Sequence, residues 1–157
     1  MLTFGPVKVE RWKPDESAAC AYLRADKLIL HGSCITTVGD LACEPCRVLP
    51  AGAEDAELGA ALLDVLAAAK IAAPPPIDSK VEEQMIMAAA GVRSWKQFHK
   101  GAVNCCISMT PQQITILPTR NEGRAFFHVP EHAIRLLVGS TPEQFGKALR
   151  EGFVRCT

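Results

Sequence analysis

Two cysteines separated by two residues form the clearest chemical motif in this chain. Cys43-Glu44-Pro45-Cys46 is a C-x-x-C sequence, a spacing found in half of a structural zinc site or in a redox dithiol. Zinc requires four ligands, and no second C-x-x-C or H-x-x-x-H follows. Redox chemistry requires the motif to open a helix, whereas Arg47-Val48-Leu49-Pro50 indicates a strand. We therefore expect Cys43 and Cys46 to lie at a turn and a strand start, without metal.

Two histidines form a second possible metal site. His128 and His132 are four residues apart, a spacing that places two imidazoles on one face of a helix. Pro130 lies between them and disfavours a regular helix. We expect an exposed loop that carries two histidines.

A cysteine and a histidine could also form a catalytic dyad. Cys105 or Cys106 could act as a nucleophile with His99 as its base. The apolar neighbours of both cysteines instead predict a strand with a buried, protonated thiol. The sequence contains no glycine-rich phosphate loop, nucleophile elbow or H-E-x-x-H motif. We expect no catalytic residues and no cofactor.

A basic aromatic cluster, Trp95 to Lys100, could stack on a nucleic-acid base or anchor a protein partner. Trp95, Lys96, Phe98, His99 and Lys100 belong to it. The simpler interpretation is a short helix with an aromatic core face and a solvated lysine face. We favour this interpretation, and an RNA-binding or adaptor module is kept as an alternative.

Composition limits the class of protein. The chain has 157 residues, 48% of them hydrophobic, which suits one domain with one core. Its 17 basic and 17 acidic side chains cancel, so no overall field attracts nucleic acid or an anionic membrane. We find no basic leader and no apolar run of the roughly 20 residues that a membrane span requires. Seven cysteines in such a chain favour the reducing cytoplasm.

Hydrophobic periodicity predicts an α+β domain, a mixed or antiparallel sheet packed by three to four helices. The predicted strands are Phe4–Trp12, Leu28–His31 (closed by Gly32), Cys34–Val38, a strand from Arg47, Ala102–Met109, Ile114–Leu117, Arg124–Val129 and Ile134–Val138. The predicted helices are Asp55–Lys70, one from the capping box at Ser79 to Gly91, a short one after Ser94, and a last one after Thr141. Residues 1–157 should therefore form a single domain.

One short segment occurs twice. Glu57–Leu63 is similar to Gln144–Arg150, and an arginine followed by an apolar run precedes each copy. The shared unit is expected to be a strand, a loop and a helix. Two similar sub-units, residues 20–73 and 101–157, would then be joined by a proline-rich linker, Ala72–Pro76, and a central helix.

Several of these motifs together resemble the contact-dependent growth inhibition immunity proteins, the CdiI family. The resemblance covers about two thirds of the chain, from roughly Leu41 to the end. The similar segments are Ala90–Phe98, Ile114–Pro118, the Leu58–Leu62 helix and the Phe145–Leu149 helix.

The resemblance implies a cytosolic protein, without catalytic activity, that binds and blocks the C-terminal toxin domain of a cognate CdiA effector. Such toxins are commonly nucleases, for example tRNases. A nuclease cleft is basic because it binds phosphates, so the immunity surface should present carboxylates. The candidates are Glu54, Asp55 and Glu57 before the first long helix, and Glu82 and Glu83 on the second.

Other interpretations of these residues are left open. The same carboxylates could instead stabilise the positive ends of their helices. A small thiol- or zinc-dependent protein that uses Cys43 and Cys46 is a further alternative to an immunity protein. The sequence predicts neither membrane binding nor direct nucleic-acid binding for the immunity protein, and it leaves the oligomeric state open.

Overall fold

The computed structural model describes residues 16–36, 39–69 and 79–157. The expected strand Phe4–Trp12 and the linker Ala72–Pro76 lie outside these ranges. The described residues form an α+β domain built on a seven-stranded antiparallel sheet, which confirms the predicted fold class.

The strand order of the sheet is β3-β2-β1-β4-β5-β6, and β7 also pairs with β5. The strands are β1 Ser17–Arg24, β2 Lys27–Thr36, β3 Gly39–Pro50, β4 Ala102–Met109, β5 Gln113–Asn121, β6 Phe126–His128 and β7 Ile134–Leu137. Strands from the two halves of the chain meet where β1 pairs with β4, so the predicted sub-units share one sheet.

Strand β1 was not predicted, although it lies at the centre of the sheet. Its sequence, SAACAYLR, is rich in alanine, a residue with low β propensity. Ala19 and Ala21 are nonetheless buried in the main core. The position of β1 is decided by its neighbours β2 and β4 rather than by its own residues.

The two strands expected around Gly32 are one strand, β2. Its pairing with β3 shifts register between His31 and Gly32. The partners of these two residues are Cys46 and Cys43, so Glu44 and Pro45 of β3 are left unpaired and form a bulge past which the ladder continues. Gly32 therefore does not end the strand. The predicted boundary at Gly32 was wrong.

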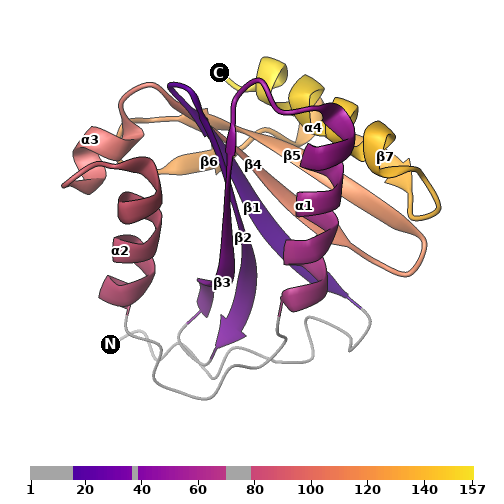
Figure 1. The fold of residues 1–157 in the computed structure, drawn as a ribbon, viewed down its shortest axis with the longest axis horizontal. Coiled ribbons are helices and arrows are strands. Elements are labelled where there is room, and N and C mark those ends of the chain that lie inside the picture. Colours follow the sequence, from indigo (N-terminus) through magenta and orange to yellow (C-terminus); the bar gives the residue numbers. More distant parts are fainter. Residues whose placement is uncertain (1–15, 37–38, 70–78) are drawn as a thin grey trace.

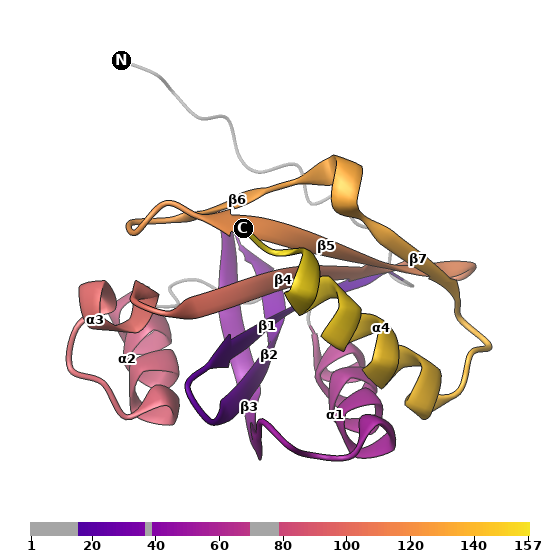
Figure 2. The same cartoon turned by 90° about the horizontal axis from the view of Figure 1, so that it is seen from above.

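Helices cover both faces of the sheet (Figure 1 and Figure 2). The helices are α1 Asp55–Ala68, α2 Ser79–Ala90, α3 Trp95–His99 and α4 Pro142–Arg155, with a 3-10 turn, η2, at Pro130–His132. Alternate residues of β2 separate the two cores, since Leu28 and Leu30 pack with α1 and α4 whereas Ile29 packs with α2 and α3.

The predicted caps of α3 and α4 and the glycine after α2 are confirmed, whereas α1 ends at Ala68 and not at the predicted Lys70. Thr141 and Gln144 form a complete capping box at α4, with Pro142 at its first turn. Ser94 accepts a hydrogen bond from the Gln97 amide at 3.1 Å and caps α3. Gly91 follows α2 with φ of +73°, a conformation that glycine adopts without strain.

The two similar segments are both a strand followed by a helix, β3 with α1 and β7 with α4. Helices α1 and α4 pack against each other. Gly59 of α1 faces the backbone of Pro142, the first residue of α4, and Gly146 of α4 faces the backbone of Asp55, the first residue of α1. The contact is therefore reciprocal.

Candidate functional site

Three of the predicted partner-binding carboxylates lie together at the start of α1. Glu54 is the N-cap residue, and its side chain makes no capping hydrogen bond. Glu54 and Glu57 are exposed. Among the described residues, no hydrogen bond or ion pair engages either carboxylate. Both are available to a partner, and both also lie at the positive end of the helix dipole.

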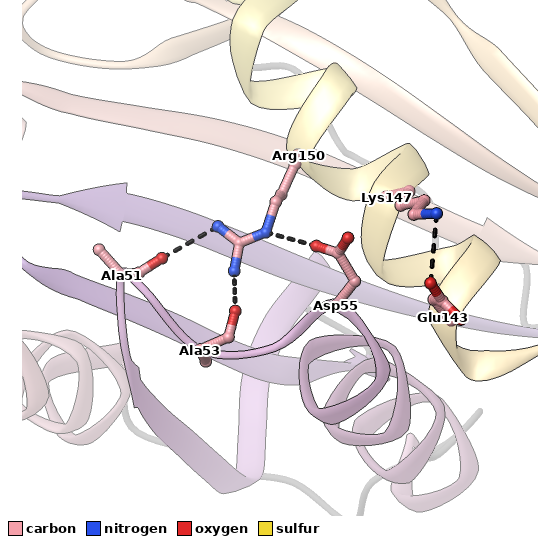
Figure 3. A network of polar contacts seen from close by, with 6 residues as sticks. All are labelled: Ala51, Ala53, Asp55, Glu143, Lys147 and Arg150. Carbon is pink, nitrogen blue, oxygen red and sulfur yellow. Dashed lines mark hydrogen bonds and ion pairs between the residues drawn. The ribbon is translucent and has the colours of Figure 1, made fainter.

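Asp55 has a structural partner. Its Oδ1 accepts a hydrogen bond from Arg150 Nε at 2.8 Å, and the two side chains are only 28% and 33% exposed. Arg150 also donates through Nη1 to the carbonyl of Ala51 at 2.9 Å and through Nη2 to that of Ala53 (Figure 3). Arg150 thus joins α4 to the loop before α1. The main role of Asp55 is therefore structural.

The other two predicted carboxylates belong to a different face. Glu82 and Glu83 lie in α2, which packs on the opposite side of the sheet from α1. Glu83 is exposed, and the side chain of Glu82 lies outside the described part. The five residues therefore do not form one continuous acidic surface.

The C-x-x-C motif lies within a strand. Cys43 and Cys46 both belong to β3, so the expectation of a turn and a strand start was wrong. Burial, reinforced by Glu44, raises the pKa of the Cys46 thiol. Within residues 16–36, 39–69 and 79–157, no group of three histidine, cysteine, aspartate or glutamate side chains could hold a metal ion.

Cys105 contacts the thiol of Cys156, a contact that the sequence did not predict. Its Sγ lies 3.8 Å from Cys156 Sγ, just beyond the end of α4. The hydrogen bond to Cys156, together with burial, raises the pKa of Cys105. The same hydrogen bond lowers the pKa of Cys156 to about 7. Cys105 is fully buried, as predicted, whereas Cys106, for which a buried thiol was also predicted, is only half-buried.

The two remaining histidine candidates do not converge on one ligand site. His128 is exposed but lies on β6, and His132 is half-buried in η2. The two histidines therefore do not share the exposed loop that was expected. His132 Nδ1 donates to the carbonyl of Arg155 at 3.0 Å, and Arg155 Nη1 donates to the carbonyl of His132 at 3.1 Å. His132 therefore fixes the end of α4.

The basic aromatic cluster forms the wall of an open hollow. Phe98 and His99 are buried, whereas Lys96 and Lys100 are exposed, which confirms the predicted division into two faces. Trp95 is half-buried and stacks on Phe98, with ring centroids 5.0 Å apart. The hollow has a volume of about 500 Å³ and is lined by Trp95, Lys96, Glu122, Gly123 and Arg124.

One asparagine holds the two walls of this hollow together. Asn121 Nδ2 donates to the carbonyls of His99 at 2.6 Å and Ala102 at 2.9 Å. Its Oδ1 accepts from the Gly123 amide at 2.8 Å. The end of α3 and the turn after β5 are therefore fixed relative to each other. The sequence linked Trp95 to its lysines but gave no sign that residues 122–124 would lie opposite.

The described part of the chain holds no helix that is both long and apolar enough to cross a membrane.

Comparison with known proteins assigns the family. Residues 37–156 match the CdiI family model, described as CDI immunity protein. The fold is similar to a protein of unknown function from Neisseria meningitidis, with a TM-score of 0.77 and 17% identity over 99% of this chain and 100% of that chain.

A second solved structure with a similar fold is a chain of the CdiA-CT/CdiI toxin and immunity complex from Yersinia pseudotuberculosis. Its TM-score is 0.76, with 19% identity over 90% of this chain and 98% of that chain. No curated protein sequence matches. Because the family model spans most of its length, this chain belongs to the CDI immunity protein family, CdiI.

Proposed function

We propose that this protein binds the C-terminal toxin domain of a cognate CdiA effector and neutralises it. The match of residues 37–156 to the CDI immunity protein family carries this proposal. The fold shared with a chain of a CdiA-CT/CdiI toxin and immunity complex supports it. The protein acts by binding, so its essential property is a surface that fits the toxin.

The proposed mechanism is occlusion of the toxin active site in the cytoplasm. An interface of about 1,200–2,000 Å² is sufficient for a stable complex of this kind. If the toxin is a nuclease or tRNase, its cleft is basic, and acidic side chains increase the rate of association.

The exposed carboxylates suit this role to different degrees. Glu54 and Glu57 are the strongest candidates, because they are exposed, adjacent and without a described partner. Asp55 supports them from the same turn while it binds Arg150. Glu82 and Glu83 would meet a different part of the toxin, because α2 lies on the other face of the sheet.

Co-expression tests the proposal directly. The last few hundred residues of the CdiA protein encoded beside this chain are expressed with and without it, and growth and co-purification are measured. We expect toxicity that this protein relieves by forming a stoichiometric complex. A toxic domain that neither binds this protein nor is relieved by it would contradict the proposal.

A further inference from the structure

The hollow beside Trp95 carries an excess of positive charge. Lys96 and Arg124 line it, and both side chains are exposed. Its one acidic residue, Glu122, is paired with Arg120. Among the described residues, no ion pair or hydrogen bond engages the charged group of Lys96 or Arg124. Two cations therefore face the hollow without a described acidic partner.

The hollow is built on a rigid base. Trp95 stacks on the buried Phe98 with an interplanar angle of 14°. His99, also buried, stacks on Phe126 with ring centroids 4.5 Å apart. Asn121 fixes the turn that carries Arg124 against the end of α3. A partner would not have to order this site, and preorganisation of this kind reduces the entropic cost of binding.

We propose that this hollow binds an acidic side chain, aspartate or glutamate, of the cognate toxin domain. The inference rests on the proposed function and adds a second contact region to it. A carboxylate that enters the hollow would meet Lys96 and Arg124 across an opening that Trp95 flanks. Arginine offers a carboxylate two parallel hydrogen bonds, and tryptophan supplies apolar contact area at low entropic cost.

The hollow is positively charged, whereas the start of α1 is negatively charged. Glu54 and Glu57 suit a basic catalytic cleft, whereas the hollow suits an acidic loop outside that cleft. Catalytic clefts of related nucleases share a charge pattern, but their peripheral loops need not. The hollow is therefore a site where a cognate toxin can be distinguished from a non-cognate one, because a mismatched loop leaves desolvated cations unpaired.

Charge reversal tests the contact. Lys96→Glu and Arg124→Glu are made singly and together, with Lys147→Glu as the matched control on α4, where Lys147 is 63% exposed. Thermal unfolding followed by circular dichroism verifies that each variant folds. We expect the double variant to weaken toxin binding by roughly tenfold or more, and the control to change it little. An unchanged affinity of the double variant would overturn the inference.

A carbodiimide cross-link identifies the toxin group. The reagent joins a lysine amine to a carboxylate in contact with it as an amide, and it takes up the water that is released. We expect the wild-type complex to join Lys96 to one toxin aspartate or glutamate, located by mass spectrometry. Lys96→Arg should abolish this cross-link and preserve affinity. Complexes that form tightly with no cross-link at Lys96 would oppose the proposal.

The outcomes separate the two proposals. If the wild-type chain fails to bind the toxin at all, the proposed function fails. If the wild type binds and the double variant binds equally well, only the role of the hollow fails. If the double variant loses affinity for RNA and keeps its affinity for the toxin, the hollow is a nucleic-acid site and the inference is wrong.

Discussion

The carbonyl oxygen of Pro142 lies 1.7 Å from the position that a Cβ atom on Gly59 would occupy. The reciprocal contact, between a Cβ on Gly146 and the carbonyl oxygen of Asp55, would be 1.9 Å. Both are far shorter than a van der Waals contact, and both obstacles are backbone atoms. The two glycines therefore allow α1 and α4 to cross at their first turns.

Gly59→Ala should destabilise the protein by roughly 2–3 kcal/mol, because the helices must separate to admit the methyl group. The better helix propensity of alanine, worth up to about 1 kcal/mol, offsets only part of this cost. Urea unfolding measures the change. Gly52→Ala is the matched control, because nothing lies within 4 Å of a Cβ there. Equal stability of the two variants would contradict the packing described here.

The second prediction concerns the arginine that joins α4 to the loop before α1. Arg150→Lys should lower the free energy of unfolding by about 1–2 kcal/mol, because one ammonium group cannot replace the planar fork that reaches Asp55 and two carbonyls. Lys147→Ala, which removes an exposed pair with Glu143, should cost about 0.5 kcal/mol or less. Denaturant titration measures the free energy of unfolding of both variants. An equal loss of unfolding free energy in the two would show that the Arg150 network adds no stability.

The third prediction separates interface carboxylates from structural ones. Glu54→Lys with Glu57→Lys should weaken toxin binding while stability changes by about 1 kcal/mol or less. Asp55→Asn should instead reduce stability through its lost pairing with Arg150. Glu131→Lys, an exposed change in η2, serves as the control for binding. Calorimetric titration with the purified toxin domain measures affinity. Unchanged affinity of the double variant would remove α1 from the interface.

The fourth prediction concerns thiol reactivity. With a pKa of about 7, Cys156 should be alkylated by iodoacetamide at a rate that rises as the pH passes through about 7. Cys105, whose pKa is raised by Cys156 and by burial, should react only after unfolding. Peptide mass spectrometry assigns the modified site. Cys105→Ala removes the hydrogen bond and should shift the Cys156 profile to higher pH. Faster modification of Cys105 than of Cys156 would reverse the assignment.

The fifth prediction follows from a buried histidine. Burial lowers the pKa of His31, and its Nε2 is buried without a partner among the described residues. The unfolded chain therefore takes up a proton first as the pH falls below the ordinary value of 6.5. As the pH falls below 6.5, the free energy of unfolding should therefore decrease, and it should stop decreasing once the pH is below the lowered pKa of His31 in the folded state.

His31→Leu should reduce this loss of stability in acid, whereas His128→Leu, an exposed control on β6, should leave it unchanged. Unfolding free energies at neutral and mildly acidic pH provide the comparison. An identical acid dependence in wild type and His31→Leu would assign the effect to other groups.

Local signals in the sequence were sufficient for much of the fold. The Thr141 capping box, the Ser94 cap and the β4–β5 hairpin were predicted correctly, because each depends on residues that are close in the chain. The motif resemblance also led to the correct family, which the match over residues 37–156 shows. The failures lie elsewhere. Strand β1 is rich in alanine and has few β-prone residues to mark it. Gly32 lies opposite a bulge in β3 rather than at a strand end.

The sequence by itself therefore determined the fold class, the caps of α3 and α4, the family and the two faces of the Trp95 helix. Only the tertiary structure decided that Arg150 binds Asp55, that Cys105 meets Cys156, and that Arg124 lies across a hollow from Lys96. It also separated the acidic start of α1 from Glu83. These are contacts between residues distant in the chain, and they depend on strand pairing and helix crossing, which no local pattern encodes.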